Sequence, residues 1–341
     1  MRMARWYVKP FYIASPTILL EYAGAVSANT SFEIRACTLI LRNECSKACP
    51  SAWMAPILKG GDSDVDPIAL IVKTVPEAQQ TADHLAAWLQ ARNVDVERID
   101  SDTIKNDRPD RHLSCVFVLG GDGTFLSAVR WIGDRPIPIL GVKFGEVGFL
   151  AEVAADDLFA AAEAVLAKNY KIEERMRLVT TVIRNNRPHY CESVLNDVVI
   201  NAGTLARLTL IPTYINDHYL TTFRADGLIV ASPTGSTAYS LAAGGPVVHP
   251  QVPGIVMTPI CPFTLTNRPL VVPDSTRILI KPEEQSAHLI LTLDGQAGFA
   301  IHDGDAILIE KSPHPVRMIQ VPDGEYFDVL KAKLSWSGGR A

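Results

Sequence analysis

The sequence predicts an α/β protein with two domains, an N-terminal doubly wound, Rossmann-like domain and a mostly β C-terminal domain. In the first part, short continuous apolar runs alternate with stretches of helical spacing, which is typical of a parallel sheet covered by helices. After about residue 176, short apolar runs are separated by Asn, Asp, Gly and Pro turns, which favours β structure. A chain of 341 residues is long enough to form two hydrophobic cores.

The expected domain boundaries follow these changes in pattern. Residues 1–66 show no sustained helix or strand period and are predicted to be an extension outside the core. We expect the α/β domain over 67–175, the β-rich domain over 176–315 and a tail over 316–341. A transit peptide is the alternative interpretation of the extension, because residues 1–20 contain three basic residues and no acidic one.

The elements of the first domain are predicted in order along the chain. Residues 68–72 form a continuous apolar run, as in a strand covered on both faces. Thr74 and Glu77 have capping-box spacing around Pro76, which predicts a helix that ends near Asn93. Further strands are expected at 94–96, 115–119 and 137–142, and further helices at 125–131 and 159–166.

The second domain is predicted from its short apolar runs. Strands are expected at 178–183, 194–200, 208–214, 228–230, 278–280, 289–293 and 307–309, and the tail has helical spacing over 327–334.

Composition limits the classes of function. The net charge of −5 gives no support for binding to nucleic acid or to an anionic membrane. Six cysteines without a CxxC pair are typical of free thiols in a reducing compartment, so we expect a cytoplasmic protein. No apolar run reaches the roughly 18–20 residues that span a bilayer.

The sequence GGDGT at residues 120–124 is a candidate phosphate loop. It lies between a predicted strand and a predicted helix, where glycines expose backbone N–H groups and the helix N-terminus favours an anion. The loop comprises Gly120, Gly121, Gly123 and Thr124 around Asp122. Phosphoryl transfer needs an acceptor for the hydroxyl proton, and Asp122 is the candidate. The alternative is an ordinary tight turn, and in either case we expect the Asp122 side chain to be dispensable for packing.

Two further segments are typical of a ligand site. Residues 224–246 combine small residues, hydroxyls and one carboxylate, which leave room for a flat ligand near the backbone. The amide of Asn196 and the carboxylate of Asp197 precede a predicted strand, where they suit an adenine edge and ribose hydroxyls. From spacing alone, a polar turn explains the second segment equally well.

Taken together, these segments resemble the NAD kinase family over roughly residues 67–341. The resemblance includes GGDGT, Asn196-Asp197, the 224–246 loop, residues 258–262 and 267–270, and the Asp294-Gly295-Gln296 signature. It implies a tail that returns to the first domain, and phosphorylation of the 2′-hydroxyl of the NAD adenosine ribose with ATP and Mg²⁺ or another divalent metal. It also implies a homo-oligomer, a dimer or tetramer, and no protein-only metal site.

The resemblance also implies roles for individual residues. Asp122 would accept the 2′-hydroxyl proton, Asp226 would face the nicotinamide side and Gln296 would close the pocket. Arg207 and Arg224 would contact the dinucleotide. The NAD-binding set that it implies is Asp122, Gly123, Asn196, Asp197, Arg207, Arg224, Asp226, Thr237, Ala238, Tyr239, Ser240, Leu241, Ala242 and Gln296.

Some positions depart from the family pattern, and two other functions compete. Ser127 is shorter than the basic residues often found there, Phe263 stands where His is common, and Glu146 replaces Arg, Ser or Thr. A lipid kinase of the diacylglycerol type also has GGDGT, but it leaves residues 224–246 unexplained. A non-catalytic dinucleotide-binding module is the other alternative, and the intact Asp122 argues against it.

Overall fold

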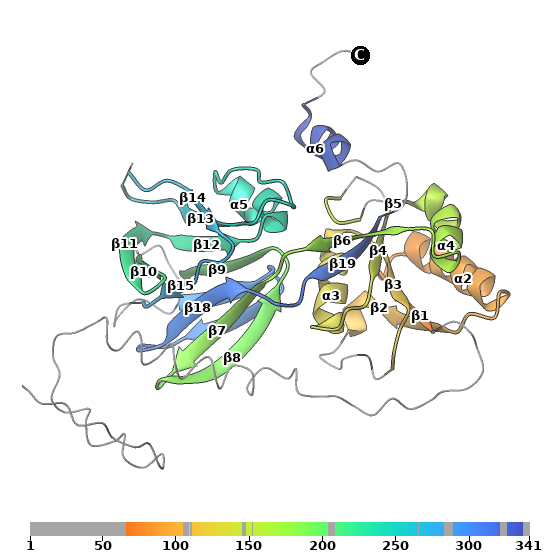
Figure 1. Ribbon diagram of the computed structural model, residues 1–341, viewed down its shortest axis with the longest axis horizontal. Coiled ribbons are helices and arrows are strands. Elements are labelled where there is room, and N and C mark those ends of the chain that lie inside the picture. The colour runs from red at the N-terminus through yellow and green to blue at the C-terminus, as the bar shows by residue number, and fades with distance from the viewer. Residues whose placement is uncertain are drawn as a thin grey trace, which may run out of the picture.

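The computed structural model describes residues 66–104, 109, 111–144, 148–151, 153–203, 209–264, 266–282, 289–320 and 326–336. The predicted extension therefore lies outside the described residues, apart from Asp66. An α/β part and a β sandwich lie side by side, with helix α3 between the sheet of the first part and the sandwich (Figure 1).

The first part is built on a seven-stranded sheet in the order β2-β1-β3-β4-β19-β6, with β5 also paired to β4. Its strands are β1 (Ile68–Val72), β2 (Val96–Asp100), β3 (Cys115–Leu119), β4 (Ile139–Lys143), β5 (Val153–Ala154), β6 (Lys171–Arg175) and β19 (Val316–Gln320). The pairs among β1 to β5 are parallel, and β6 runs antiparallel to β19. Strand β19 comes from the tail, so the tail does return to the first sheet.

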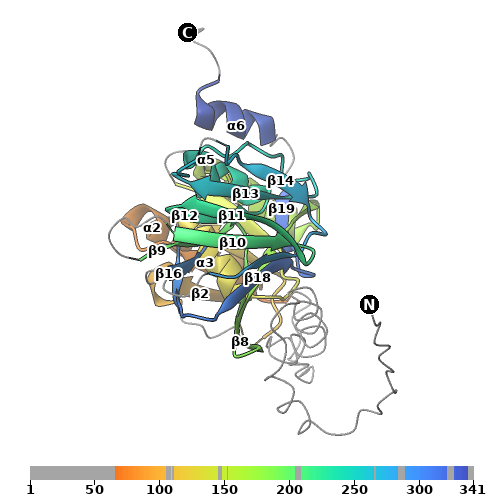
Figure 2. The ribbon, with the colours of Figure 1, turned by 90° about the vertical axis from the view of Figure 1, so that its left-hand side faces the viewer.

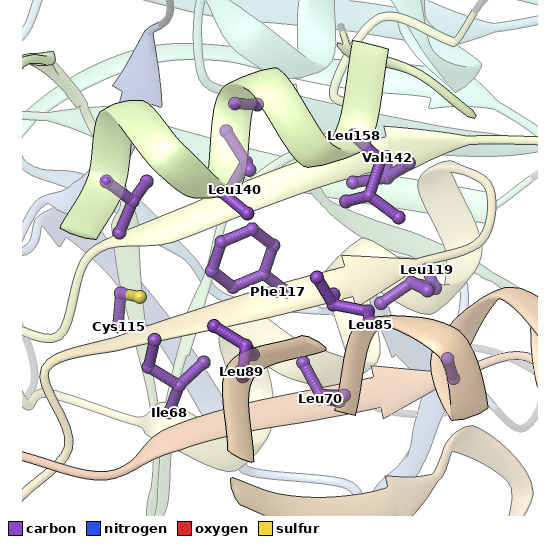
Figure 3. Packing of buried hydrophobic residues seen from close by; sticks show 14 of the residues in the cluster. Ile68, Leu70, Leu85, Leu89, Cys115, Phe117, Leu119, Leu140, Val142 and Leu158 are labelled. Atoms are coloured by element: carbon purple, nitrogen blue, oxygen red, sulfur yellow. The ribbon is translucent and has the colours of Figure 1, made fainter. Parts of the chain in front are cut away.

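Helices cover both faces of this sheet, as a doubly wound fold requires. Helices α2 (Pro76–Gln90) and α4 (Leu158–Leu166) pack on the face that carries Phe117 and Leu140, and Figure 3 shows these side chains between the two helices. Helix α3 (Asp122–Ile132) packs on the other face, against Val116 and Val118. Short 3-10 turns occupy Ser101–Thr103 and Ala155–Asp157. Because the β3 residues alternate between two apolar layers, the strand reads as a continuous apolar run.

The second part is a sandwich of two six-stranded sheets, and several of its strands run across the view in Figure 2. Neighbouring strands are antiparallel throughout both sheets. One sheet, in the order β11-β10-β15-β18-β7-β8, contains β7 (Leu178–Arg184), β8 (Arg187–Val194), β10 (Thr209–Ile215), β11 (His218–Ala225), β15 (Ile278–Ile280) and β18 (Ala306–Lys311). The other, in the order β14-β13-β12-β9-β16-β17, contains β9 (Asp197–Ala202), β12 (Gly227–Ala231), β13 (Gly254–Ile260), β14 (Leu270–Pro273), β16 (Leu289–Leu293) and β17 (Ala297–Ile301). Apolar side chains from both sheets form one core between them.

The fold class is confirmed, but several elements differ from the sequence-based predictions. The strand expected at 94–96 lies at Val96–Asp100, and the strand expected at 194–200 is broken between β8 and β9. The capping box is wrong, because Val75 is the N-cap of α2 and no side chain bonds to the helix start there. The patterns did not predict β5, β6, β8, β11, β13, β14, β17 or β19.

The helix of the tail, α6 (Tyr326–Leu334), contacts the sandwich part of the chain. The ring of His249, between α5 and β13, lies 4.7 Å from the Tyr326 ring and 5.5 Å from the Phe327 ring, measured between centroids. The tail thus reaches both parts, through β19 to the first sheet and through α6 to the sandwich.

Candidate active site

A cavity of about 370 Å³ opens on the sandwich beside the start of β9. Its volume lies in the range of small-molecule pockets, and several polar groups converge on it. The lining residues come from β9 and the turn before it, from the loop after β12, and from the end of β16: Asn196, Asp197, Val199, Asn201, Ala238, Tyr239, Thr292, Asp294 and Gly295.

The turn that carries Asn196 into this cavity is held by the carboxylate of Asp294. One oxygen, Oδ2, accepts the backbone N–H of Leu195 at 2.9 Å, and the other, Oδ1, accepts those of Asn196 at 2.7 Å and Asp197 at 3.1 Å. The Asp294 N–H in turn donates to the Asp197 carbonyl at 3.0 Å. A carboxylate accepts several hydrogen bonds at once, so one side chain satisfies three consecutive donors. This is why the chain leaves β8 and turns before β9. The apolar pattern predicted a strand over 194–200, whereas the interpretation of Asn196-Asp197 as a polar turn agrees with the structure.

The loop after β12 holds the same turn from the other side. Ser232 donates its backbone N–H to the Asn196 carbonyl at 2.9 Å and its hydroxyl to the Leu195 carbonyl at 2.5 Å. Gly235 lies so close that a Cβ atom there would be 2.0 Å from the Asn196 carbonyl oxygen. Only glycine permits this approach. The small residues that the sequence places in this loop therefore bring it against the pocket wall.

Two neighbouring carboxyl groups shape the electrostatics of the cavity. Burial and the nearby Asp294 raise the pKa of Asp197 to about 7, although a hydrogen bond from the Tyr239 backbone opposes the shift. Burial also raises the pKa of Asp294, against the lowering effect of the three backbone N–H groups and of Arg177. Near neutral pH, the Asp197 carboxyl can therefore be protonated or ionised, so it can either donate a hydrogen bond to a ligand hydroxyl or accept one from it.

The second half of the site is the start of α3. Gly121 is the N-cap and Asp122 the first helical residue, so the loop is shorter than GGDGT implies. The Asp122 carboxylate accepts the N–H groups of Phe149 and Leu150, each at 3.0 Å. A Cβ at Gly148 would lie 2.2 Å from Asp122 Oδ1. The expectation that this side chain is dispensable for packing is wrong, because it fastens residues 148–150 to the helix start.

The glycines of this loop leave space in front of the helix. A Cβ at Gly121 or Gly123 would meet no atom within 4 Å, whereas one at Gly120 would lie 2.5 Å from the Thr124 hydroxyl oxygen. Gly120 is therefore needed for close packing, and the other two glycines border open space. The partial positive charge of the helix start faces the same region, which suits a phosphate group.

The two halves of the site are connected by a direct hydrogen bond. The side-chain amide of Gln296, just after the pocket residue Gly295, donates to the Gly123 carbonyl at 2.8 Å. The Ser127 hydroxyl, on the next turn of α3, donates to Gln296 Oε1 at 3.5 Å. The cavity and a helix start that suits a phosphate group thus lie next to each other.

Comparisons with known proteins agree with this arrangement. Residues 96–170 match the ATP-NAD kinase N-terminal domain, and residues 195–321 match the ATP-NAD kinase C-terminal domain. The chain is 53% identical over 280 residues to an NAD kinase of Desulfatibacillum aliphaticivorans, a match that covers 80% of this chain and 99% of the relative. The chain belongs to the NAD kinase family. An NAD kinase of Geobacter metallireducens is 44% identical over 270 residues, which covers 76% of this chain and 95% of that protein.

Solved NAD kinase structures share the fold. Yeast NADH kinase complexed with NADH is 26% identical, has a TM-score of 0.72 and matches 82% of this chain and 90% of its own. An NAD kinase from Archaeoglobus fulgidus in complex with ATP is 25% identical, has a TM-score of 0.65 and matches 79% of this chain and 98% of its own. The lipid-kinase alternative loses its support, because the family match also covers the C-terminal part.

The structure brings only part of the residue set predicted for an NAD kinase to the cavity. Asn196, Asp197, Ala238 and Tyr239 line it, and Gln296 joins Gly123 beside it. Arg224 is exposed with its guanidinium 5.3 Å from the Phe263 ring centroid, and Asp226 is exposed at the end of β11. Arg207 and Glu146 lie outside the described residues. The roles of Arg207, Arg224 and Asp226 stay predictions.

The loop residues 237–242 divide by what their side chains contact. The Thr237 hydroxyl donates to the Thr234 carbonyl at 3.1 Å, within a 3-10 turn over Thr234–Thr237. Ser240 is buried and shares a hydrogen bond of 2.8 Å with the Thr258 hydroxyl. Leu241 and Ala242 complete the short helix α5 (Tyr239–Ala242). The hydroxyl groups of Thr237 and Ser240 thus stabilise the loop, while Ala238 and Tyr239 face the cavity.

Sequence reasoning missed the role of Asp294. The residue was noted only as part of a family signature, because its hydrogen bonds reach residues 97 to 99 positions earlier in the chain.

The residues that the structure describes contain no group of three or more His, Cys, Asp or Glu side chains suited to a metal ion. The same residues contain no helix long and apolar enough to cross a membrane.

Proposed function

We propose that this chain transfers the γ-phosphoryl group of ATP to the 2′-hydroxyl of the adenosine ribose of NAD, which yields NADP and ADP. The observation that carries the proposal is the junction of two sites. A cavity lined by Asn196 and Asp197 is joined through Gln296 to the helix start that bears Asp122. The family match and the neighbours with bound NADH and ATP support the same chemistry.

Asp122 serves as the proton acceptor in this proposal. The 2′-oxygen attacks the γ-phosphorus, the bond from that phosphorus to the bridging oxygen of ADP breaks, and the hydroxyl proton passes to the carboxylate. Each oxygen of Asp122 accepts one backbone N–H and keeps a further lone pair for the hydroxyl hydrogen. The backbone N–H groups thus orient the base without occupying it.

The remaining parts of the site follow from the chemistry of the substrates. Asn196, Asp197, Ala238 and Tyr239 hold the adenosine part, and the helix start beside Gly121 and Gly123 faces the phosphates. A divalent cation such as Mg²⁺ fits best as a partner of the ATP phosphates, because the described residues offer no acidic cluster for it. We further propose a homo-oligomer and a cytoplasmic location.

The test is a substrate panel with the full chain. NAD, NADH and diacylglycerol are each supplied with ATP and Mg²⁺, and the products are separated by chromatography. We expect phosphorylated dinucleotide and no phosphorylated lipid. Phosphorylation of the lipid alone, or of nothing, would refute the proposal.

The variant Asn196→Ala tests whether the dinucleotide binds in the cavity. Removing this side-chain amide is expected to raise the KM for NAD much more than the KM for ATP, because the amide lines only the dinucleotide pocket. Equal effects on both constants, or no effect, would exclude Asn196 from the NAD site.

A further inference from the structure

The turn between β16 and β17 contacts both halves of the active site. It runs through Leu293, Asp294, Gly295 and Gln296, and its two central residues have positive φ, 50° at Asp294 and 64° at Gly295. This is the backbone of a tight hairpin turn, closed by the Gln296 N–H on the Leu293 carbonyl at 3.0 Å, and the first ladder pair beyond it joins Leu293 to Ala297. Two of its side chains contact different parts of the site, Asp294 the turn before β9 and Gln296 the start of α3.

On one side, the turn fixes the dinucleotide pocket. The Asp294 carboxylate accepts the N–H groups of Leu195, Asn196 and Asp197, as described above. Asn196 and Asp197 are therefore placed by a residue that lies about a hundred positions further along the chain. Hydrogen bonds from three backbone donors to one charged acceptor are among the stronger polar contacts in proteins.

On the other side, the same turn fixes α3. The Gln296 amide donates to the Gly123 carbonyl at 2.8 Å, and the Leu293 carbonyl accepts from the Arg130 guanidinium at 3.5 Å. Arg130 also forms an ion pair of 3.2 Å with Glu192 on β8. Gly123 directly follows Asp122, so the hydrogen bond from Gln296 acts on the first turn of the helix that carries the proton acceptor.

We propose that the β16–β17 turn is a positioning element of the phosphoryl transfer. Asp294 positions the side chains that bind the dinucleotide, and Gln296 sets the distance between that dinucleotide and Asp122. The inference rests on the proposed function. It adds two positioning residues with separable effects, since Asp294 acts on the pocket and Gln296 acts on the helix start.

Two isosteric substitutions test this division. In Asp294→Asn, one acceptor oxygen is replaced by an amide nitrogen, which leaves a backbone N–H of the turn without its partner. We expect an increase of about 10-fold or more in the KM for NAD, with kcat changed by less than about 3-fold, as for loss of a charge-assisted hydrogen bond in a binding site.

In Gln296→Met, the side chain keeps its length and loses the donor to Gly123. We expect kcat to fall by about 10-fold, because small displacements of reacting groups are costly. The dissociation constant for NAD, measured by calorimetry without ATP, should stay within about 2-fold of the parent value. Asp303→Asn, in the exposed turn between β17 and β18, is the matched control. It should change neither kcat nor the KM and dissociation constant for NAD.

The outcomes distinguish failure of this inference from failure of the proposed function. If the parent chain makes no NADP from NAD and ATP, the proposed function fails. If the parent is active and both variants match the control, or both lower only the melting temperature, the turn is merely structural and the inference is overturned. The Gln296 side chain is exposed, so we expect the Gln296→Met variant to fold. This variant alone decides the inference if the Asp294→Asn variant does not fold.

Discussion

In the proposed mechanism, Asp122 combines a catalytic task with a structural one in the same side chain. Its carboxylate accepts the N–H groups of Phe149 and Leu150, and the residue lies between two glycines in sequence, Gly121 and Gly123, at which an added Cβ would meet no atom within 4 Å. A substitution at this position therefore changes both turnover and the anchoring of residues 148–150. The two effects must be measured separately.

For Asp122→Asn we expect a fall in kcat of at least about 100-fold, the lower range for loss of a general base. The amide leaves one backbone donor unsatisfied, so the free energy of unfolding should also fall by about 1–3 kcal/mol. Steady-state NADP formation and thermal unfolding report the two effects. Asp328→Asn, a first-turn aspartate of α6 that is exposed, is the control. Near-normal turnover in Asp122→Asn would contradict the catalytic assignment.

Asp197 should make stability depend on pH. Burial and the nearby Asp294 raise its pKa to about 7 in the folded protein, from about 3.8 for a free aspartate side chain. Between these values the folded protein holds a proton that the unfolded chain has released, so the free energy of unfolding decreases as pH rises from about 4 to about 7. Asp197→Asn removes the titrating group and the like charge beside Asp294.

We expect Asp197→Asn to be more stable than the parent at pH 8 by at least about 1 kcal/mol, since one unit of pKa shift corresponds to about 1.4 kcal/mol. The advantage should shrink towards pH 4. Urea unfolding at several pH values, without ligand, gives the difference directly. If the difference in free energy of unfolding between the variant and the parent stays constant or grows as pH falls, burial does not raise the pKa of Asp197.

At the scale of elements, the break between β8 and β9 shows where sequence reasoning reached its limit. The alternation of apolar runs and helical stretches predicted the fold class, and most buried strands were found within a residue or two. Residues 194–200 read as one strand because they contain no Gly or Pro. The break is imposed by Asp294 and Gly235, which approach from distant parts of the chain. Half of the candidate site, the Asn196-Asp197 turn, was recognised by its residue types, but its support was not.

The fit of the loop after β12 against this turn can be tested with Gly235→Ala. The added methyl group would overlap the Asn196 carbonyl, so backbone must move, which costs about 1–3 kcal/mol. We expect lower stability together with a higher KM for NAD, as measured by thermal unfolding and steady-state kinetics. In the control Gly298→Ala the added carbon would meet no atom nearer than 3.9 Å. If the two variants have the same stability and the same KM for NAD, the loop after β12 does not fit tightly against the Asn196 carbonyl.

At the scale of the whole molecule, α3 is the part that joins the two halves. Gln296 of the sandwich contacts its first turn, and Arg130 in its last turn donates to the Leu293 carbonyl of the sandwich. Arg177, just before β7, donates to the carbonyl of the residue that follows the helix. Arg177 is buried and donates to the Gly133 carbonyl at 2.7 Å and to the Ser193 carbonyl at 3.2 Å. The relative position of the two parts is thus set at both ends of a single helix.

For Arg177→Met we expect a loss of about 2–4 kcal/mol in the free energy of unfolding, because buried carbonyls and Asp134 lose a charged partner. Arg317→Met is the control, since its 3.6 Å pair with Glu174 is exposed and worth at most about 1 kcal/mol. Chemical denaturation measures both. If the free energy of unfolding falls by similar amounts in the two variants, the buried contacts of Arg177 contribute no more to stability than an exposed ion pair.

The position of β19 dictates an order of assembly. Among the residues that the structure describes, strand β6 pairs only with β19, and Met318 of β19 pairs with Ile139 of β4. During synthesis, the first sheet therefore stays incomplete until the whole sandwich has emerged, while the sandwich strands from β7 to β18 are contiguous in sequence. We expect the second part to complete its fold before the first, the reverse of the usual N-terminal-first order. The half of the enzyme that carries Asp122 thus closes only when nearly the entire chain has been made.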